Sequence, residues 1–264
     1  MKLPDIVKDY LPFLIFPAVI SIFFFALPMD LQNHFAFNPQ VHDWFTLFTA
    51  SFFHNNLDHL KNNIFGYLVG SFALFLAFKY QSDTNSLFFL ILACVLIVPF
   101  VSSITVYFLT PTIPPARGFS DIVFSVVGLF PAATLMFMKS RAWIVYIAAW
   151  LLLEVTAYFY VFSLYVGVLI LLFAYILLFS FWGWKTKFFS KEWLAKQIGV
   201  LYVLIITPFI LLLLGFPAVF VANGSLINVM AHYMGFQVGA AIGAIYLYRD
   251  YVSHVFSSVT SLIN

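Results

Sequence analysis

The amino-acid sequence predicts an all-α polytopic membrane protein with about eight membrane-spanning helices. Hydrophobic residues make up 64% of the 264 residues and charged residues only 8%, whereas an ordinary soluble domain has about 25% charged residues. So few charges cannot cover the surface of a soluble fold of this size, and the high apolar content also excludes a disordered chain. The apolar residues fall in runs of about 20, the length that a helix needs to cross about 30 Å of hydrocarbon.

Eight apolar runs reach this length, and the whole chain (1–264) is expected to form one membrane-embedded domain. The runs cover residues 11–28, 57–78, 87–109, 118–138, 142–161, 163–184, 198–216 and 229–248. The stretch 142–184 contains no lysine or arginine, and as a single helix it would measure about 64 Å, twice the hydrocarbon thickness. We therefore predict two spans there, joined by a turn near Val161–Leu164.

The distribution of lysine and arginine predicts the orientation in the membrane. If the N-terminus lies inside, ten of the 12 basic residues fall in inside segments, and only Lys61 and Arg117 fall outside. Positive charge accumulates on the cytoplasmic side of membrane proteins. We therefore expect a multi-pass protein of the cell membrane with both termini in the cytoplasm.

Several kinds of partner are disfavoured by the composition. The basic residues are dispersed along the chain, whereas a nucleic-acid surface needs them clustered. The single cysteine, Cys94, excludes an internal disulfide and a cysteine-based metal site. The zinc-protease motif H-E-x-x-H is absent, and six histidines are too few for a histidine-box oxidoreductase. We expect no metal, no other cofactor and no nucleic acid, and the lipid bilayer as the surrounding partner.

Polar residues gather where the second, fourth and eighth spans begin. Polar groups inside membrane spans are costly and often functional. Even-numbered spans all start at the outer face, so the three clusters are expected at one depth near the outer surface. The clusters contain His54, His59 and Asn63; Gly118, Ser120 and Asp121; and His232 and Gly235.

These residue types suit nucleophilic catalysis. A serine hydroxyl is a weak nucleophile and needs an adjacent base, and His232 can accept the Ser120 proton and later deliver it to a leaving amine. The amide of Asn63, the N–H of His59 and the backbone N–H of Ser120 are candidate donors to the oxyanion. No carboxylate completes a triad, so a Ser–His dyad is predicted, with Phe124 packing against the imidazole one turn after Ser120.

Small residues continue along the eighth span at a spacing of four. Gly235, Gly239 and Gly243 form a ridge on one face of the predicted helix. Such ridges let two membrane helices approach closely. The ridge supports close packing of this span but does not discriminate between functions.

Taken together, the clusters resemble the motifs of the rhomboid intramembrane serine proteases. The matching pattern is His54-x4-His59-x3-Asn63, Gly118-x-Ser120 and Ala231-His232-x2-Gly235-x3-Gly239. The resemblance covers about residues 11–138 and 198–248. It implies a rhomboid-like bundle with a six-span core, into which 142–184 is inserted as a two-span hairpin.

The resemblance also implies roles for individual residues. Ser120 would be the nucleophile and His232 the base, His59 and Asn63 would bind the oxyanion, and His54 would support the site. Gly128 would pack in the serine helix. The implied activity is cleavage of the transmembrane segments of other membrane proteins near the outer face, with a lateral substrate entrance at the seventh span and residues 217–228.

Two local features depart from the family pattern. Asp121 stands where the family usually has glycine after the nucleophile, and a carboxylate pointing into the site would oppose a growing oxyanion. Trp44 is followed by Phe45 instead of arginine in the first outer loop. The direction in which the Asp121 side chain points therefore bears on whether the site is active.

Two other functions fit parts of the sequence. A catalytically inactive relative would bind membrane segments without cleaving them. A small transporter would use Glu154 in the fifth span and the mid-span prolines Pro99 and Pro208. The transporter is disfavoured because the polar residues gather near one face and the chain has no duplicated half.

Overall fold

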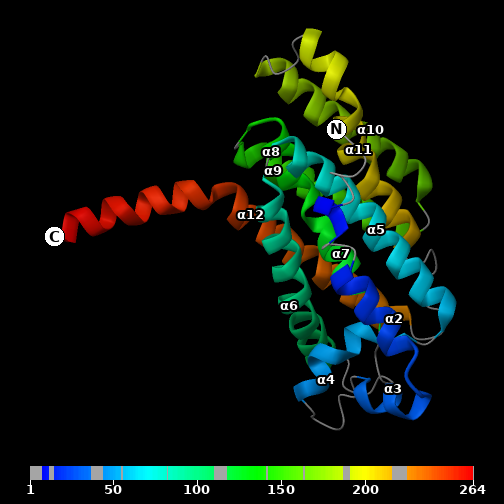
Figure 1. The fold of residues 1–264 in the computed structure, drawn as a ribbon. Coiled ribbons are helices and arrows are strands. Elements are labelled where there is room, and N and C mark those ends of the chain that lie inside the picture. The colour runs from blue at the N-terminus through cyan, green and yellow to red at the C-terminus, as the bar shows by residue number, and fades with distance from the viewer. Residues whose placement is uncertain are drawn as a thin grey trace.

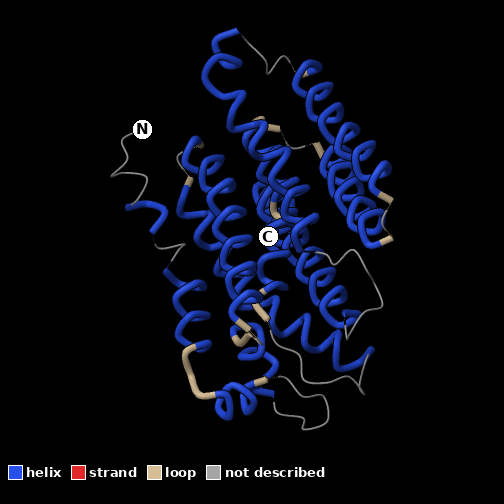
Figure 2. Tube along the Cα trace, turned by 90° about the vertical axis from the view of Figure 1, so that its right-hand side faces the viewer, coloured by secondary structure: helices blue, strands red, loops and turns tan. Residues whose placement is uncertain are grey.

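The structure is a computed structural model, and the part of the chain that it describes is helical. It describes residues 8–11, 15–36, 44–54, 56–81, 83–109, 118–140, 142–162, 164–186, 191–215 and 225–263. Within these ranges every regular element is a helix (Figures 1 and 2). The elements are η1 (Ile15–Val19), α2 (Ile20–Phe25), α3 (Met29–Phe35), α4 (Trp44–Thr49), η2 (Ala50–Phe52), α5 (Leu57–Tyr80), α6 (Thr84–Leu109), α7 (Ser120–Gly128), α8 (Phe130–Phe137), α9 (Trp143–Val161), α10 (Tyr165–Lys185), α11 (Lys191–Gly215) and α12 (Ser225–Ile263).

Six of the described helical segments are long and apolar enough to cross a membrane. They are Leu57–Tyr80, Thr84–Phe108, Ser120–Phe137, Trp143–Tyr160, Tyr165–Lys185 and Gln197–Leu214. The protein is therefore a polytopic helical membrane protein. Among the described residues, six of the eight predicted spans meet this criterion.

The first and the eighth predicted spans are the two that do not meet this criterion among the described residues. Within the described residues of the first, the apolar helical stretch is Phe16–Phe25, which is about 15 Å long; residues 12–14 lie outside the described residues. Pro17 lies inside its π-helical turn η1, and a proline lacks the N–H that a regular α-helix would use there. The eighth lies inside α12, which is long enough to span, but glycines and polar residues such as His232 and Gln237 lower the apolar content of its bundle-facing side.

The charge-free stretch 142–184 forms two helices, as its length predicted. α9 ends at Val161 and α10 begins at Tyr165. The two helices pack against each other at the edge of the bundle. Of the 18 most apolar consecutive residues of each helix, only 33% in α9 and 22% in α10 are buried inside the protein. Most of this hairpin therefore faces the surroundings.

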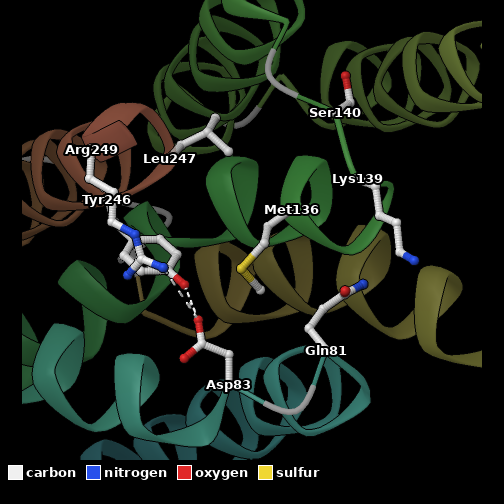
Figure 3. A pocket seen from close by; sticks show the side chains of 8 residues that line it. All are labelled: Gln81, Asp83, Met136, Lys139, Ser140, Tyr246, Leu247 and Arg249. Atoms are coloured by element: carbon white, nitrogen blue, oxygen red, sulfur yellow. Dashed lines mark hydrogen bonds and ion pairs between the residues drawn. The ribbon is translucent and has the colours of Figure 1, made fainter. Parts of the chain in front are cut away.

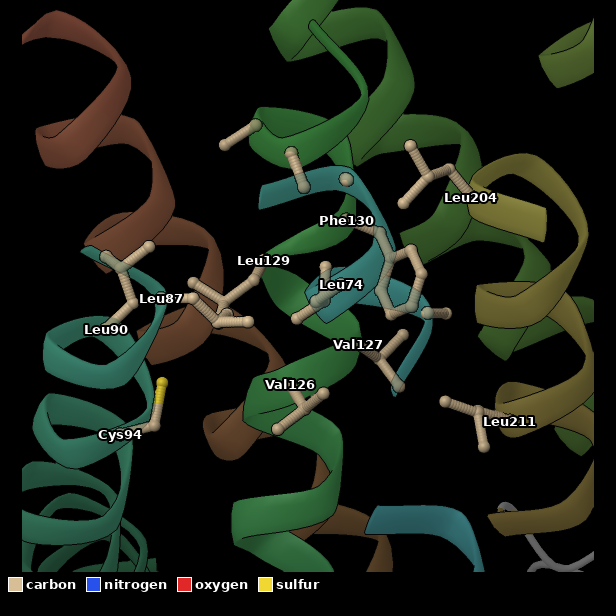
Figure 4. Close-up of a cluster of buried hydrophobic side chains, with 14 of the residues drawn as sticks. Leu74, Leu87, Leu90, Cys94, Val126, Val127, Leu129, Phe130, Leu204 and Leu211 are labelled. Carbon is tan, nitrogen blue, oxygen red and sulfur yellow. The ribbon is translucent and has the colours of Figure 1, made fainter. Parts of the chain in front are cut away.

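The segment α7–α8 occupies the centre of the bundle. Of the residues Ser120–Phe137, 94% are buried inside the protein, and every residue of α7 is buried. Helices α5, α6, α11 and α12 pack around α7. Figure 4 shows the resulting core, in which Val127 of α7 lies between Leu74 of α5 and Leu211 of α11.

The contact between α7 and α12 is a contact between backbones. A Cβ atom added at Gly239 would lie 1.9 Å from the carbonyl oxygen of Ser125, and one at Gly235 would lie 2.0 Å from that of Asp121. From the opposite helix, a Cβ at Gly128 would lie 2.2 Å from the carbonyl oxygen of Phe236. Only glycine fits at these three positions, because any side chain would displace one helix from the other.

Helix α12 continues far beyond this contact. Its 39 residues correspond to about 58 Å, nearly twice the hydrocarbon thickness. Its C-terminal part extends away from the bundle (Figure 1). The short helices α3 and α4 lie at the lower end of the same view. The segment that contacts α7 is therefore the N-terminal half of α12.

We predict that Gly239→Ala destabilises the protein, because the new methyl group would meet the Ser125 carbonyl. The expected loss is about 1–3 kcal/mol, the range for overpacked cores, measured as a lower midpoint of thermal unfolding in detergent. The matched control is Gly199→Ala in α11, where an added Cβ meets nothing within 4 Å. Equal unfolding midpoints for the two variants would contradict the close α7–α12 contact.

Candidate functional site

The structure brings the three predicted polar clusters together around the N-terminal end of α7. His54 precedes α5 and lies fully buried. Its Nε2 atom lies 3.0 Å from Nδ2 of Asn63 and accepts the backbone N–H of Phe119 at 3.4 Å. Phe119 is the residue before Ser120, so His54 connects the start of α5 directly to the start of the serine helix.

Burial keeps the His54 imidazole neutral. Burial first, and the nearby His59 second, lower the pKa of His54 from 6.5 to about 3. A neutral ring has one nitrogen that can accept a hydrogen bond, and here that nitrogen is the Nε2 atom that Phe119 contacts. His54 therefore acts as a neutral acceptor that orients Asn63 and the loop before Ser120.

His59 lies against the loop that leads into α7. Gly118 has φ +144°, and a Cβ there would lie 2.7 Å from Cε1 of the His59 ring. The rings of His54 and His59 meet edge to face, with centroids 5.1 Å apart. His59 is also close enough to His232 to interact with it electrostatically. Glycine at 118 thus allows both the unusual backbone angle and the approach of the imidazole.

His232 packs on α7 through Phe124, one turn after Ser120. The rings of Phe124 and His232 are stacked, with centroids 4.4 Å apart and 14° between their planes. Ser120 lies one turn before Phe124 on the same face of α7. The side chains of Ser120 and His232 are buried, with 8% and 5% of their surface exposed. The imidazole therefore lies against α7 one turn after the residue that carries the hydroxyl.

The Asp121 carboxyl group is directed to α6 and η2. Its Oδ2 accepts the hydroxyls of Ser102 at 2.6 Å and Ser51 at 2.8 Å, and its Oδ1 accepts the backbone N–H of Ile122 at 2.8 Å. The sequence analysis left open whether this carboxyl group points into the site. Its hydrogen bonds instead fix it on the side of α7 that faces Ser51 and Ser102.

Two of these partners were missed by the sequence analysis. Ser51 and Ser102 have no motif that marks them, and they lie 70 and 19 residues from Asp121 in the chain. One signal was present: Ser102 and Ser103 interrupt an apolar run three residues after Pro99. A buried acid in the neighbouring span is a suitable partner for hydroxyls at such a position.

Some of the sequence predictions lie outside the residues that the structure describes. These include Arg117 and most of the expected substrate entrance at 217–228. The seventh span itself, α11, packs closely on α5, where a Cβ at Gly70 would lie 3.0 Å from the side chain of Leu211. In the described ranges no three histidine, cysteine or acidic residues gather as a metal site.

A second polar region lies where α5 ends and α6 begins, around a cavity of about 330 Å³ (Figure 3). The hydroxyl of Tyr246 donates to Asp83, and Arg249 lies 3.9 Å from the same carboxylate. The Arg249 guanidinium also stacks over the Tyr246 ring at 4.5 Å. These contacts connect the start of α6 to α12, so they help to fix the helix that carries His232.

We predict that the protein loses stability as the pH falls from about 6.5 toward 3, because of His54. In this range the unfolded chain binds the proton that the buried imidazole excludes, so protonation favours unfolding. His54→Gln should therefore flatten the dependence of the thermal unfolding midpoint on pH. The exposed His34 gives the matched control, His34→Gln. An unchanged pH slope in His54→Gln would contradict the buried neutral imidazole.

Comparison with known proteins gives one family match, which is to part of the chain. The family is described as the Ycf66 protein N-terminus, and its model matches residues 89–166. This segment runs from α6 to the start of α10. It includes Ser120 but none of His59, Asn63 and His232. No curated protein and no solved structure matches the chain.

The rhomboid assignment made from the sequence motifs is therefore wrong. The family that matches is the Ycf66 N-terminus and not a rhomboid family. The motifs consist of serine, asparagine, histidine and glycine near helix starts, where these residues also serve as caps and close-packing positions. Short motifs built from such common residue types occur in more than one protein family. The site must be judged on its own geometry.

Proposed function

We propose that this protein is an intramembrane serine endopeptidase that cleaves transmembrane segments of other membrane proteins with a Ser120–His232 dyad. The observation that supports this most strongly is the stacking of His232 on Phe124, one turn after Ser120. The stack fixes the plane of the imidazole against α7, one turn after Ser120. A fixed orientation matters because proton transfer requires the base within hydrogen-bond reach of the hydroxyl.

In this proposal His232 moves a proton twice. It takes the proton of the Ser120 hydroxyl as the oxygen attacks the carbonyl carbon of the scissile peptide bond. It then gives the proton to the leaving amine as the C–N bond breaks, which leaves an acyl-enzyme on Ser120. A water molecule that loses a proton to His232 hydrolyses the acyl-enzyme and restores the free serine.

The start of α7 and the two residues of α5 would stabilise the oxyanion. The first N–H groups of a helix have no partner inside the helix, and they carry partial positive charge. His59 lies against Gly118, and Asn63 is oriented by His54. One well-placed donor is worth about 10²–10³ in rate, so two side chains and a helix end form a sufficient set.

The position of Asp121 removes an objection to this mechanism. Its carboxyl group accepts hydrogen bonds from the hydroxyls of Ser51 and Ser102 and from the backbone N–H of Ile122. An acid in the first turn also interacts favourably with the helix dipole. The proposal therefore assigns Asp121 to the stabilisation of the α7 N-terminus, which holds Ser120, and not to the chemistry.

We place the protein in the cell membrane with both termini in the cytoplasm and the dyad near the outer face. The bias of basic residues toward one side supports this orientation. The helices that begin at Leu57, Ser120 and Ser225 carry the site residues near their N-terminal ends. The mechanism needs no metal, no other cofactor and no nucleic acid.

One alternative has an observation in its favour. Ser120 and His232 are both buried, which also fits a protein that binds membrane segments without cleaving them. A transporter would use the intramembrane Glu154, which accepts a hydrogen bond from Tyr233. The cleavage experiment separates these functions from the protease.

We predict that wild-type protein cleaves a labelled single-span substrate in liposomes near the outer end of its span, with excess chelator present. Ser120→Ala and His232→Ala should each lose this activity by about 10³-fold or more, because each removes one half of the dyad. Gly199→Ala is the matched control and should keep full activity.

Two results would contradict the proposal. Equal cleavage by all variants would assign the activity to a contaminant. Inactivity of the wild type that persists in Asp121→Gly would favour the binding protein without catalysis.

A further inference from the structure

Helices α9 and α12 are joined along their length by long side chains. The indole of Trp150 donates to Oε1 of Gln237 at 3.1 Å, and the hydroxyl of Tyr233 donates to Oε1 of Glu154 at 2.9 Å. We call these four residues the α9–α12 seam. Trp143, which stacks on Tyr248 with ring centroids 3.7 Å apart, extends the contact toward the far end of both helices.

This seam is built differently from the other contacts of α12. Against α7 the backbones touch, and Gly235 and Gly239 leave no space. Helices α6, α7 and α8 pack closely along α12, whereas α9 reaches it mainly through side chains. Since α9 lies at the edge of the bundle with most of its surface outward, moving these side chains would open a path from the lipid toward α12.

Two buried polar atoms of the seam have no hydrogen-bond partner among the described residues. They are the second carboxyl oxygen of Glu154, Oε2, and the amide nitrogen of Gln237, Nε2. Buried polar groups normally have partners, and the membrane core has no water to supply them. The seam therefore offers one spare carboxyl oxygen on α9 and one spare N–H donor on α12.

A peptide group matches this pair of atoms. Each peptide carries an N–H donor and a C=O acceptor. A membrane-spanning helix satisfies both internally, but a serine can attack only a carbonyl that is freed from the helix. Cleavage inside the membrane therefore leaves several backbone groups of the substrate unpaired, and these groups need polar partners close to the dyad.

The seam begins one residue after His232 in α12, on the face of that helix that is turned toward α9. Tyr233 follows His232 directly in α12, and its hydroxyl orients Glu154. Tyr158, one turn after Glu154, also contacts the Tyr233 ring, with centroids 6.4 Å apart. A segment that reached His232 from the side of α9 would pass these side chains first.

We propose that the α9–α12 seam binds the unwound main chain of the substrate, with Glu154 and Gln237 pairing one of its peptide groups. The inference rests on the proposed protease function and adds the path by which the substrate reaches the dyad. It differs from the entrance expected at α11, because α11 is closely packed on α5. Glu154 and Gln237 are binding residues here and take no part in proton transfer.

The first test uses the kinetics of substrate cleavage in liposomes. Glu154→Gln keeps the oxygen that accepts from Tyr233 but replaces the spare oxygen with an N–H donor. Gln237→Leu removes the spare donor from the opposite wall. Each variant should raise KM about tenfold, as expected when one buried hydrogen bond is lost, and should change kcat less than about twofold.

The matched control is Thr156→Val, two residues from Glu154 on the same helix. The Thr156 hydroxyl bonds to the carbonyl of Leu152 inside α9 and does not face the seam, so KM should stay at the wild-type value. The double variant Glu154→Gln with Gln237→Glu exchanges the two groups across the seam. The substrate N–H would then meet an amide N–H at position 154 and the substrate carbonyl a carboxylate at position 237, so the double variant should not recover affinity. A kcat close to the wild-type value in each single variant shows that these variants fold.

A second readout does not depend on catalysis. In a Ser120→Ala background, the labelled single-span peptide should bind about tenfold more weakly when Glu154→Gln is added, and equally well when Thr156→Val is added. Unchanged binding and KM in both seam variants, with cleavage that still requires Ser120, would overturn the seam and leave the protease intact. Cleavage that does not require Ser120 would overturn the protease itself.

Discussion

The close contact between α7 and α12 is the constraint on which the rest of the site depends. Three glycines let the two backbones touch, and a methyl group at Gly235 or Gly239 would already meet a carbonyl oxygen of α7. This contact sets the distance between the helix that begins with Ser120 and the helix that carries His232. Since α7 is buried on every side, it cannot shift to accommodate a change. The stack of Phe124 on His232 follows from this fixed geometry.

The polar residues of the bundle are arranged so that most of them satisfy one another. Asp121 is held by two serines from other elements, and His54 pairs with Asn63. In a membrane such pairing is required, because no water replaces a missing partner. The spare atoms of Glu154 and Gln237 are two of the buried side-chain atoms that have no hydrogen-bond partner among the described residues, and they lie in the same seam. An unpaired acceptor and an unpaired donor in one seam are a reason to look for a ligand, and here a substrate main chain fits both atoms.

Periodicity and length predicted the class of fold but not every span. The break between α9 and α10 followed from a stretch too long for one helix. In the first run the described apolar helix is Phe16–Phe25, shorter than a span, and Pro17 lies in its π-helical turn. The direction of the Asp121 side chain depends on Ser51, 70 residues away, so no local pattern could give it. The partner of Glu154 was hidden for the same reason, because Tyr233 lies 79 residues further along the chain. The rhomboid resemblance failed because motifs of common capping and packing residues do not identify a family.

The most direct test of the account is whether His232 activates the Ser120 hydroxyl. The measurement is covalent labelling of the purified protein in liposomes by a serine-reactive fluorophosphonate, with the modified residue identified by mass spectrometry. The account predicts labelling at Ser120 in the wild type and labelling slowed by about 10²-fold or more in His232→Ala, because the hydroxyl loses its base. Labelling of Ser120 at the same rate in both proteins, or no labelling of Ser120 in the wild type, would contradict the dyad.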